Sequence, residues 1–332
     1  MNVAYSLDDS ALVEVPILTN TTKITLEAGN LNANDTIDVI FYIYNSMQSR
    51  QRWTGVTTAK GAGLVVTGLN LDATAKLTTT KVYPLRPKRC VFFGDSITEG
   101  VASQCHADVS CTAAGDLCNN AATKTWGTAV AAALDCEYSQ VGFGGLGWTV
   151  GGGGAVVPFF TPGDPSKSSW NQIYDGAPRD FTKSGEQPID YIFILHATND
   201  GLREPTQDPA IVSASVTGWL NAQRPKVGPA TEIFLTVPFG AFGSTQHPIG
   251  ALKAGFEAYQ KGTPDKHTHF LDLGPSASKG LTHFGQHSIE GCGGIHPKGG
   301  TRKTARHGEL GAMLSVAAVR AMATAGVLRD EI

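Results

Sequence analysis

A serine follows directly on an apolar stretch in the segment GDSITEG, residues 94–100. Residues 90–94 predict a strand, so Ser96 would stand at the carboxyl end of that strand, where its hydroxyl and its own backbone N–H can both face a substrate. The segment is not the G-x-S-x-G elbow, a pattern that occurs nowhere in the chain. The structural alternative is a serine that simply caps the following helix.

Three more segments place small or polar residues beside predicted elements. Residues 141–147 (VGFGGLG) follow a predicted strand at 137–142, and residues 197–200 (ATND) follow another at 190–196. Residues 293–297 (GGIHP) precede a predicted final helix over 304–325. Together with GDSITEG, these segments resemble the four ordered blocks of SGNH (GDSL-type) hydrolases.

The resemblance implies a role for one residue in each block. Ser96 would attack an ester carbonyl, and His296 would take its proton and return one to the leaving alcohol. Gly145, with Gly144 as the alternative, and the side-chain amide of Asn199 would join the Ser96 N–H in stabilising the oxyanion.

Two residues depart from the family pattern. Ala197 replaces a glycine, which is tolerable if its φ is not positive. Gly293 stands where an aspartate would orient His296, so a backbone carbonyl could bind the imidazole, another acid such as Glu290 could reach it, or catalysis could be lost. The carbonyl is favoured, because such Ser–His dyads occur in family two of the carbohydrate esterases. Asp200 is expected to organise its loop.

Those esterases also carry a β-sandwich ahead of the SGNH domain, and the resemblance to them implies removal of acetyl groups from sugars or plant polysaccharide. Trp148 and Trp170 fall in loops near the expected site. Either indole could stack on a sugar ring, or it could be a packing plug. Both are taken as candidate substrate contacts.

The elements needed to position these residues can be predicted as well. Residues 1–84 read as short strands, clearest at 37–44 and also at 24–26, 63–67 and 76–83, which predicts a small jelly-roll-like β-sandwich. Residues 85–332 alternate strands and helices, which predicts an α/β, three-layer SGNH-type domain with a parallel sheet covered on both faces. The expected elements are strands 90–94, 137–142, 190–196, 231–237 and 269–273, and helices near 125–135, 209–223, 250–261 and 304–325.

Composition excludes several other classes of protein. Net charge is −3, and Lys and Arg are scattered, so nucleic acid is not an expected partner. No apolar run of transmembrane length occurs, and no membrane partner is expected.

Residues 142–147 match G-x-G-x-x-G, but no helix pattern follows, so no cofactor is predicted. His267 and His269 lack companion ligands for a metal.

Six cysteines and two N-x-T sequons favour a secreted protein, with disulfides whose pairing sequence cannot give. The first residues carry acids where a signal peptide needs an apolar stretch, so a signal would have been removed; an intracellular protein is the alternative. Cys292, close to His296, is expected to be a disulfide or a buried thiol rather than a nucleophile.

The sequence therefore predicts a serine esterase acting on small acyl esters, with acylated carbohydrate as the expected substrate. One alternative is a decayed, non-catalytic carbohydrate-binding protein, motivated by Gly293. Another is a lipid esterase on the same fold, which the lack of a long apolar lid helix disfavours. The oligomeric state stays open.

Overall fold

The computed structural model describes most of the chain from residue 86 onward and part of what precedes it. The described residues are 2–7, 10–11, 13–16, 23–26, 36–45, 51–54, 68, 70, 76, 86–101, 103, 120–181, 188–202, 207–239, 249–273 and 306–327.

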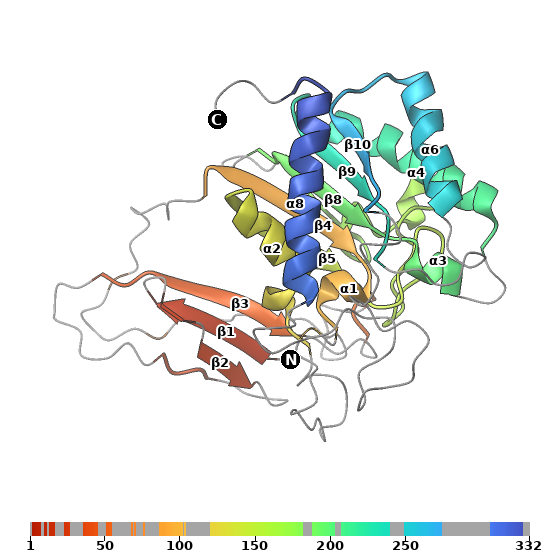
Figure 1. The fold of residues 1–332 in the computed structure, drawn as a ribbon. Helices are drawn as coiled ribbons and strands as arrows, with labels where there is room; N and C mark the ends of the chain where they lie inside the picture. The colour runs from red at the N-terminus through yellow and green to blue at the C-terminus, as the bar shows by residue number, and fades with distance from the viewer. Residues whose placement is uncertain are drawn as a thin grey trace.

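A five-stranded parallel sheet forms the centre of the larger part of the molecule (Figure 1). Every residue of β8 and β9 is buried, because helices cover both faces of the sheet. The strand order is β10-β9-β8-β4-β5. The strands are β4 (Lys88–Gly94), β5 (Cys136–Gly142), β8 (Tyr191–Leu195), β9 (Glu232–Thr236) and β10 (Thr268–Leu271).

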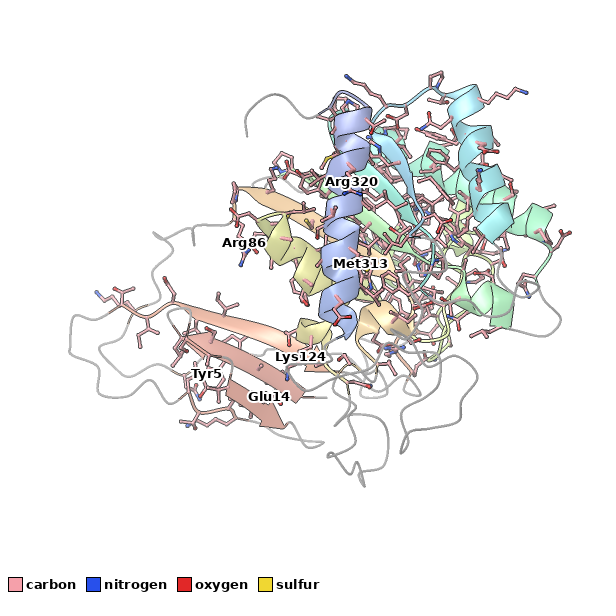
Figure 2. All side chains as sticks on the ribbon, viewed as in Figure 1. Tyr5, Glu14, Arg86, Lys124, Met313 and Arg320 are labelled. Carbon is pink, nitrogen blue, oxygen red and sulfur yellow. The ribbon has the colours of Figure 1, made fainter. Side chains whose placement is uncertain are left out.

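Two pairs of helices cover the sheet. On one face, α2 (Trp126–Ala133) packs beside α8 (Arg306–Thr324); on the other, α4 (Pro209–Gln223) packs beside α6 (Ile249–Gly262). Alternate residues of β4 supply the two cores, since Phe92 faces the α2–α8 side and Phe93 faces the α4–α6 side. Figure 2 shows Met313 and Arg320 along the outer helix α8.

Short elements complete this part of the molecule. The helices α1 (Ser96–Glu99) and α3 (Thr198–Leu202) follow β4 and β8 directly. The 3-10 turns are η2 (Ala122–Lys124), η3 (Pro165–Lys167) and η4 (Arg224–Lys226), and a small hairpin is formed by β6 (Gln172–Tyr174) and β7 (Ala177–Pro178).

The N-terminal region contributes a three-stranded antiparallel sheet, in the order β2-β1-β3, beside the parallel sheet (Figure 1). Its strands are β1 (Asn2–Leu7), β2 (Val13–Pro16) and β3 (Val39–Asn45). Ala4 of β1 is fully buried against Ala121, which precedes η2. Tyr5 and Glu14, labelled in Figure 2, mark the two neighbouring strands β1 and β2.

Residues 51–54 belong to the N-terminal region by sequence but contact the α/β part. Trp53 is buried in the core cluster on the α4–α6 side. The Arg52 N–H donates to the Gly154 carbonyl (3.2 Å), and the Trp53 carbonyl accepts from the Asp175 N–H (3.1 Å). The boundary after residue 84 stays a prediction, and these four residues tie the two parts together.

The expected α/β architecture with an all-β region ahead of it is confirmed, and each strand and helix predicted from residue 90 onward is present. The strand expected at residues 24–26 is wrong, because these residues form no strand. The strand expected at 63–67 lies outside the described residues, as does the strand expected at 76–83 apart from Lys76, which is in no strand. Within the described part of the chain, no helix is long and apolar enough to cross a membrane.

Candidate active site

Ser96 lies just beyond the carboxyl end of β4, as the first residue of α1, and it is 5% exposed. Helix α1 is capped by Asp95, whose Oδ1 accepts the Ile97 N–H at 2.9 Å. The cap is therefore the aspartate, and the alternative of a capping serine is wrong. Helix α1 ends after a single turn at Gly100, whose φ of +88° suits glycine.

Two glycines at strand ends allow α1 to sit close to the sheet. A Cβ on Gly142, at the end of β5, would lie 2.5 Å from the Glu99 backbone nitrogen. A Cβ on Gly94, at the end of β4, would lie 1.9 Å from the Thr98 hydroxyl oxygen. The nucleophile turn can approach the loop after β5 because neither position carries a side chain.

The glycine-rich loop after β5 lies beside α1 and distinguishes the two glycine candidates. The Gly144 N–H donates to Glu99 Oε2 at 2.7 Å, in a buried hydrogen bond. That donor is already used, which leaves Gly145 as the better candidate for an oxyanion contact. Gly145 has a φ of +76°, a conformation that other residues rarely adopt.

Asn199, on α3 after β8, joins the other two loops. Its Nδ2 donates to the Leu146 carbonyl at 2.9 Å and lies 3.4 Å from Asp95 Oδ2. Leu146 follows Gly145, and Asp95 precedes Ser96, so one amide group bridges the nucleophile turn and the glycine loop. Asn199 is 8% exposed, which leaves the amide at the edge of the interior.

Asp200 organises the continuation of the same loop. Its Oδ2 accepts the Trp148 N–H, and its Oδ1 accepts both the N–H and the hydroxyl of Thr149, each at 2.8 Å. A Cβ on Gly147 would lie 2.4 Å from Asp200 Oδ2, so this approach also requires glycine. The contacts agree with the loop-organising role expected for Asp200.

Burial affects the ionisation of both aspartates. It raises the pKa of Asp95 to about 7, although hydrogen bonds from the Ile97 N–H and the Thr198 side chain oppose the change and the nearby Asp200 charge adds to it. Burial likewise raises the pKa of Asp200, against the hydrogen bonds from Thr149 and Trp148. Asp95 therefore changes charge near neutral pH, directly beside Ser96.

The alanine at position 197 is expected to be tolerable only if its φ is not positive, and the structure does not meet this condition. The φ of Ala197 is +114°, in the region that favours glycine, at the point where the chain leaves β8 for α3. The residue is fully buried. The alanine therefore introduces backbone strain, on the order of 1–3 kcal/mol, where the family pattern has glycine.

The expectation that Trp148 and Trp170 contact substrate is not compatible with their packing. Trp148 is 0% and Trp170 1% exposed, and both belong to the core cluster on the α4–α6 side. The Trp148 ring contacts Phe159 edge-on with centroids 5.2 Å apart, and Trp170 stacks on Phe181. Neither indole has a free face for a sugar ring, and both are packing plugs.

Several predicted residues fall where the structure gives no description. His296, Gly293, Glu290 and Cys292 lie outside the described residues, so the partner of the histidine is not among the observations. Among the described cysteines, Cys90 and Cys136 are buried free thiols on adjacent strands. Burial, with the neighbouring Cys136, raises the pKa of Cys90, which keeps it a thiol.

His267 and His269 form a structural cluster with Glu232. The Nδ1 of His267 and the Nε2 of His269 each lie 2.6 Å from a different Glu232 oxygen. Within the described residues, no group of His, Cys, Asp or Glu side chains is arranged to hold a metal ion.

Sequence reasoning missed Glu99 and its buried partner Arg52. The two side chains form an ion pair and are 8% and 7% exposed, respectively. Glu99 lies inside the GDSITEG segment, and a charged residue in a segment that must pack against a sheet was the available signal.

No protein-family model matches the sequence, and no curated protein matches it either. Several solved structures, in contrast, are similar to this chain. A carbohydrate esterase family 2 enzyme with a carbohydrate-binding domain, from Corynascus thermopiles (Myceliophthora fergusii), matches with a TM-score of 0.59 at 18% identity, over 97% of this chain and 87% of that one. The acetyl xylan esterase Est2A of Butyrivibrio proteoclasticus matches with 0.55 at 14% identity, over 99% and 85%.

A family two carbohydrate esterase from Clostridium thermocellum, in complex with cellohexaose, matches with a TM-score of 0.54 at 15% identity, over 98% of this chain and 87% of that one. The chain has the fold of these enzymes. The resemblance seen in the four sequence blocks is thereby confirmed at the level of the whole architecture, including the all-β region ahead of the parallel sheet.

Proposed function

We propose that the protein is a serine esterase that hydrolyses small acyl esters, with O-acetyl groups on carbohydrate as its substrates. The observation that carries the proposal is the pair of contacts made by the Asn199 side-chain amide. The amide contacts Leu146, the residue after Gly145, on one side and Asp95, the residue before Ser96, on the other. This arrangement supports the proposal, because acyl transfer requires a nucleophile and oxyanion donors close together, and the three residues proposed for these roles come from three separate strand ends.

In the proposed reaction, the Ser96 hydroxyl oxygen attacks the ester carbonyl carbon while His296 removes the hydroxyl proton. The carbonyl oxygen becomes an oxyanion held by the N–H groups of Ser96 and Gly145 and by the Asn199 amide. The amide exchanges its long 3.4 Å contact with Asp95 Oδ2 for the oxyanion. Collapse breaks the bond to the alcohol, which leaves with the proton from His296. Water then attacks the acyl-serine in the same way and releases the acid.

Asn199 has to be an amide in this scheme. A carboxylate at the same position would repel the developing negative charge, and Asp95 and Asp200 already place acidic groups nearby. Because Gly293 replaces the usual aspartate, we assign the orientation of His296 to a backbone carbonyl that accepts its Nδ1–H.

The substrate class follows from the structural neighbours, one of which is an acetyl xylan esterase and another of which is in complex with cellohexaose. The two indoles expected to contact sugar are buried, so carbohydrate recognition must use other groups. A polymeric substrate outside the cell agrees with the secretion expected from the cysteines and sequons.

The test is hydrolysis of p-nitrophenyl acetate and release of acetate from acetylated xylan by wild type and Ser96→Ala. We expect turnover by wild type and a loss of about 10³-fold or more in the variant. Ser213→Ala is the matched control, since Ser213 lies partly exposed on α4. Equal rates in wild type and Ser96→Ala would refute the proposal.

The same assays separate the alternatives. Cellohexaose binding with no turnover would favour a non-catalytic carbohydrate-binding protein instead. A preference for long-chain p-nitrophenyl esters over the acetate would favour a lipid esterase. We expect acetate to be the best acyl group and activity to fall as the acyl chain lengthens.

A further inference from the structure

Arg52 connects the N-terminal region to the glycine loop of the candidate site. Its side chain is 7% exposed and forms a buried ion pair with Glu99. Its guanidinium lies over the Phe143 ring, 5.3 Å from the centroid, and its backbone N–H donates to the Gly154 carbonyl. Arg52 thus contacts both ends of the loop that carries Gly145.

Glu99 uses its two carboxylate oxygens for different partners. Oε1 accepts from the Arg52 guanidinium, and Oε2 accepts the Gly144 N–H at 2.7 Å. The residue lies on the same single-turn helix as Ser96, and its own N–H donates to the Asp95 carbonyl. The carboxylate therefore ties the turn that carries Ser96 to the Phe143–Gly144 peptide, one peptide before the one that carries the Gly145 N–H.

The Gly144 contact depends on Glu99 keeping its charge while buried. A buried carboxylate without a cation is strongly disfavoured, and it would either take up a proton or turn toward water. The Arg52 guanidinium compensates the charge, and a charge-assisted hydrogen bond to the Gly144 N–H is about twice as strong as a neutral one.

We infer that Arg52 is a positioning residue for the proposed esterase: through Glu99 it fixes the Gly144 peptide, and thereby sets where the Gly145 N–H points. The inference rests on the proposed function and extends it, because it assigns a residue of the N-terminal region to the oxyanion loop. Small misplacement of a catalytic donor is enough to reduce turnover by about 10²-fold.

The kinetic test compares Arg52→Gln, Arg52→Lys, Glu99→Gln and the double variant Arg52→Gln/Glu99→Gln on p-nitrophenyl acetate. We expect each Gln variant to lower kcat by about tenfold or more with little change in KM, because the oxyanion forms only after substrate binds. Arg52→Lys keeps the charge and should retain part of the rate.

The double variant measures coupling between the two side chains. Each single variant removes the Arg52–Glu99 ion pair, and the second substitution cannot remove it again, so the loss in the double variant should be smaller than the product of the single losses. Multiplicative losses would overturn the inference. Arg86→Gln is the control, because Arg86 pairs with Asp135 on the surface near the start of β4 (Figure 2), and it should leave kcat unchanged.

A second measurement does not depend on turnover. Amide hydrogen exchange should show weaker protection of the Gly144 N–H in Arg52→Gln than in wild type. Arg52→Lys should weaken this protection less. The Gly147 N–H, which donates to the Val150 carbonyl, serves as the internal reference. If Gly144 is protected equally in Arg52→Gln and in wild type, and wild type hydrolyses the ester, the role of Arg52 is overturned while the proposed function stands. Loss of protection in a chain with no turnover would leave the link intact and overturn the proposed function.

Discussion

Asp95 and Asp200, at the carboxyl ends of strands in the parallel sheet, and Asp265, near its amino end, are held by different kinds of partner. At the carboxyl ends of β4 and β8, Asp95 and Asp200 accept hydrogen bonds from neutral groups, mainly backbone N–H. Before the amino end of β10, Asp265 accepts from the Arg224 guanidinium at 2.8 Å and from the hydroxyls of Tyr259 and Thr268.

The ionisation of these acids follows the same division. Burial raises the pKa of Asp95 and of Asp200. Burial also acts to raise the pKa of Asp265, but the Thr268 hydroxyl and the Arg224 charge outweigh it, so that the pKa of Asp265 is lowered. Asp265 therefore stabilises the folded chain as an ion, whereas Asp95 and Asp200 fix loop geometry at the expense of stability.

After Ser96→Ala, the largest effect we expect is at Asn199. Asn199→Ala should lower kcat by about 10²–10³-fold, or about 2.7–4 kcal/mol, with KM nearly constant. Asn199→Asp should lose more because its charge repels the oxyanion. Asn221→Ala, on the exposed side of α4, is the control. A purely structural role for Asn199 would instead show as lost stability with kcat retained.

The next effect separates the two ends directly. Asp265→Asn removes the charge that pairs with Arg224, and we expect a loss of about 2 kcal/mol in the free energy of unfolding, with kcat unchanged. Asp200→Asn places an NH₂ group against backbone donors but also removes an uncompensated charge. It should lose less stability, about 1 kcal/mol, and at least about tenfold in kcat. Urea unfolding and ester hydrolysis measure the two quantities, and equal kcat losses in both variants would erase the distinction.

The pH dependence of stability tests the raised pKa of Asp95. Between its ordinary value of 3.8 and about 7, the folded chain holds a proton on Asp95 that the unfolded chain has released. Stability should therefore fall as pH rises through this window and level off above it. Relative to Asp95→Asn, which keeps the helix cap but cannot titrate, wild type should lose on the order of 2–3 kcal/mol between pH 5 and pH 8. A constant difference across that range would show that Asp95 is ionised throughout.

Sequence predicted the parallel sheet well because β4, β8 and β9 contain continuous apolar runs that alternate with helical stretches along the chain. Helix α4, for example, begins at Pro209 after the capping residue Asp208. The β6–β7 hairpin was missed, since strands of three and two residues with Pro178 at the end give no alternating pattern. The predicted strand at residues 24–26 failed because three alternating residues do not fix a pairing partner.

The sequence predicted the segments that form the candidate site, but not which of the side chains around it are buried. Ser96, Gly145 and Asn199 came from motifs whose order fixed their strand ends. Whether an indole after a strand is exposed depends on which chain lies over it, and Trp148 is covered by residues that follow it in the loop. The burial of Glu99 depends on Arg52, 47 residues earlier in the chain, which no local pattern could indicate.

The smallest effect concerns Ala197, whose φ of +114° lies where the chain turns from β8 into α3. Replacement by glycine should relieve about 1–3 kcal/mol of strain. The glycine also frees the unfolded backbone by about 0.5–1 kcal/mol and removes a buried methyl group worth about 0.8 kcal/mol. We therefore expect the net effect of Ala197→Gly to be centred near neutral, between about 1 kcal/mol less stable and about 2 kcal/mol more stable. Ala251→Gly, at a buried position of regular helix α6, loses the same methyl without any strain to relieve and should be destabilised by about 1–2 kcal/mol. If both substitutions destabilise equally in urea, Ala197 is not strained, and the carboxyl end of β8 holds its site without that contribution.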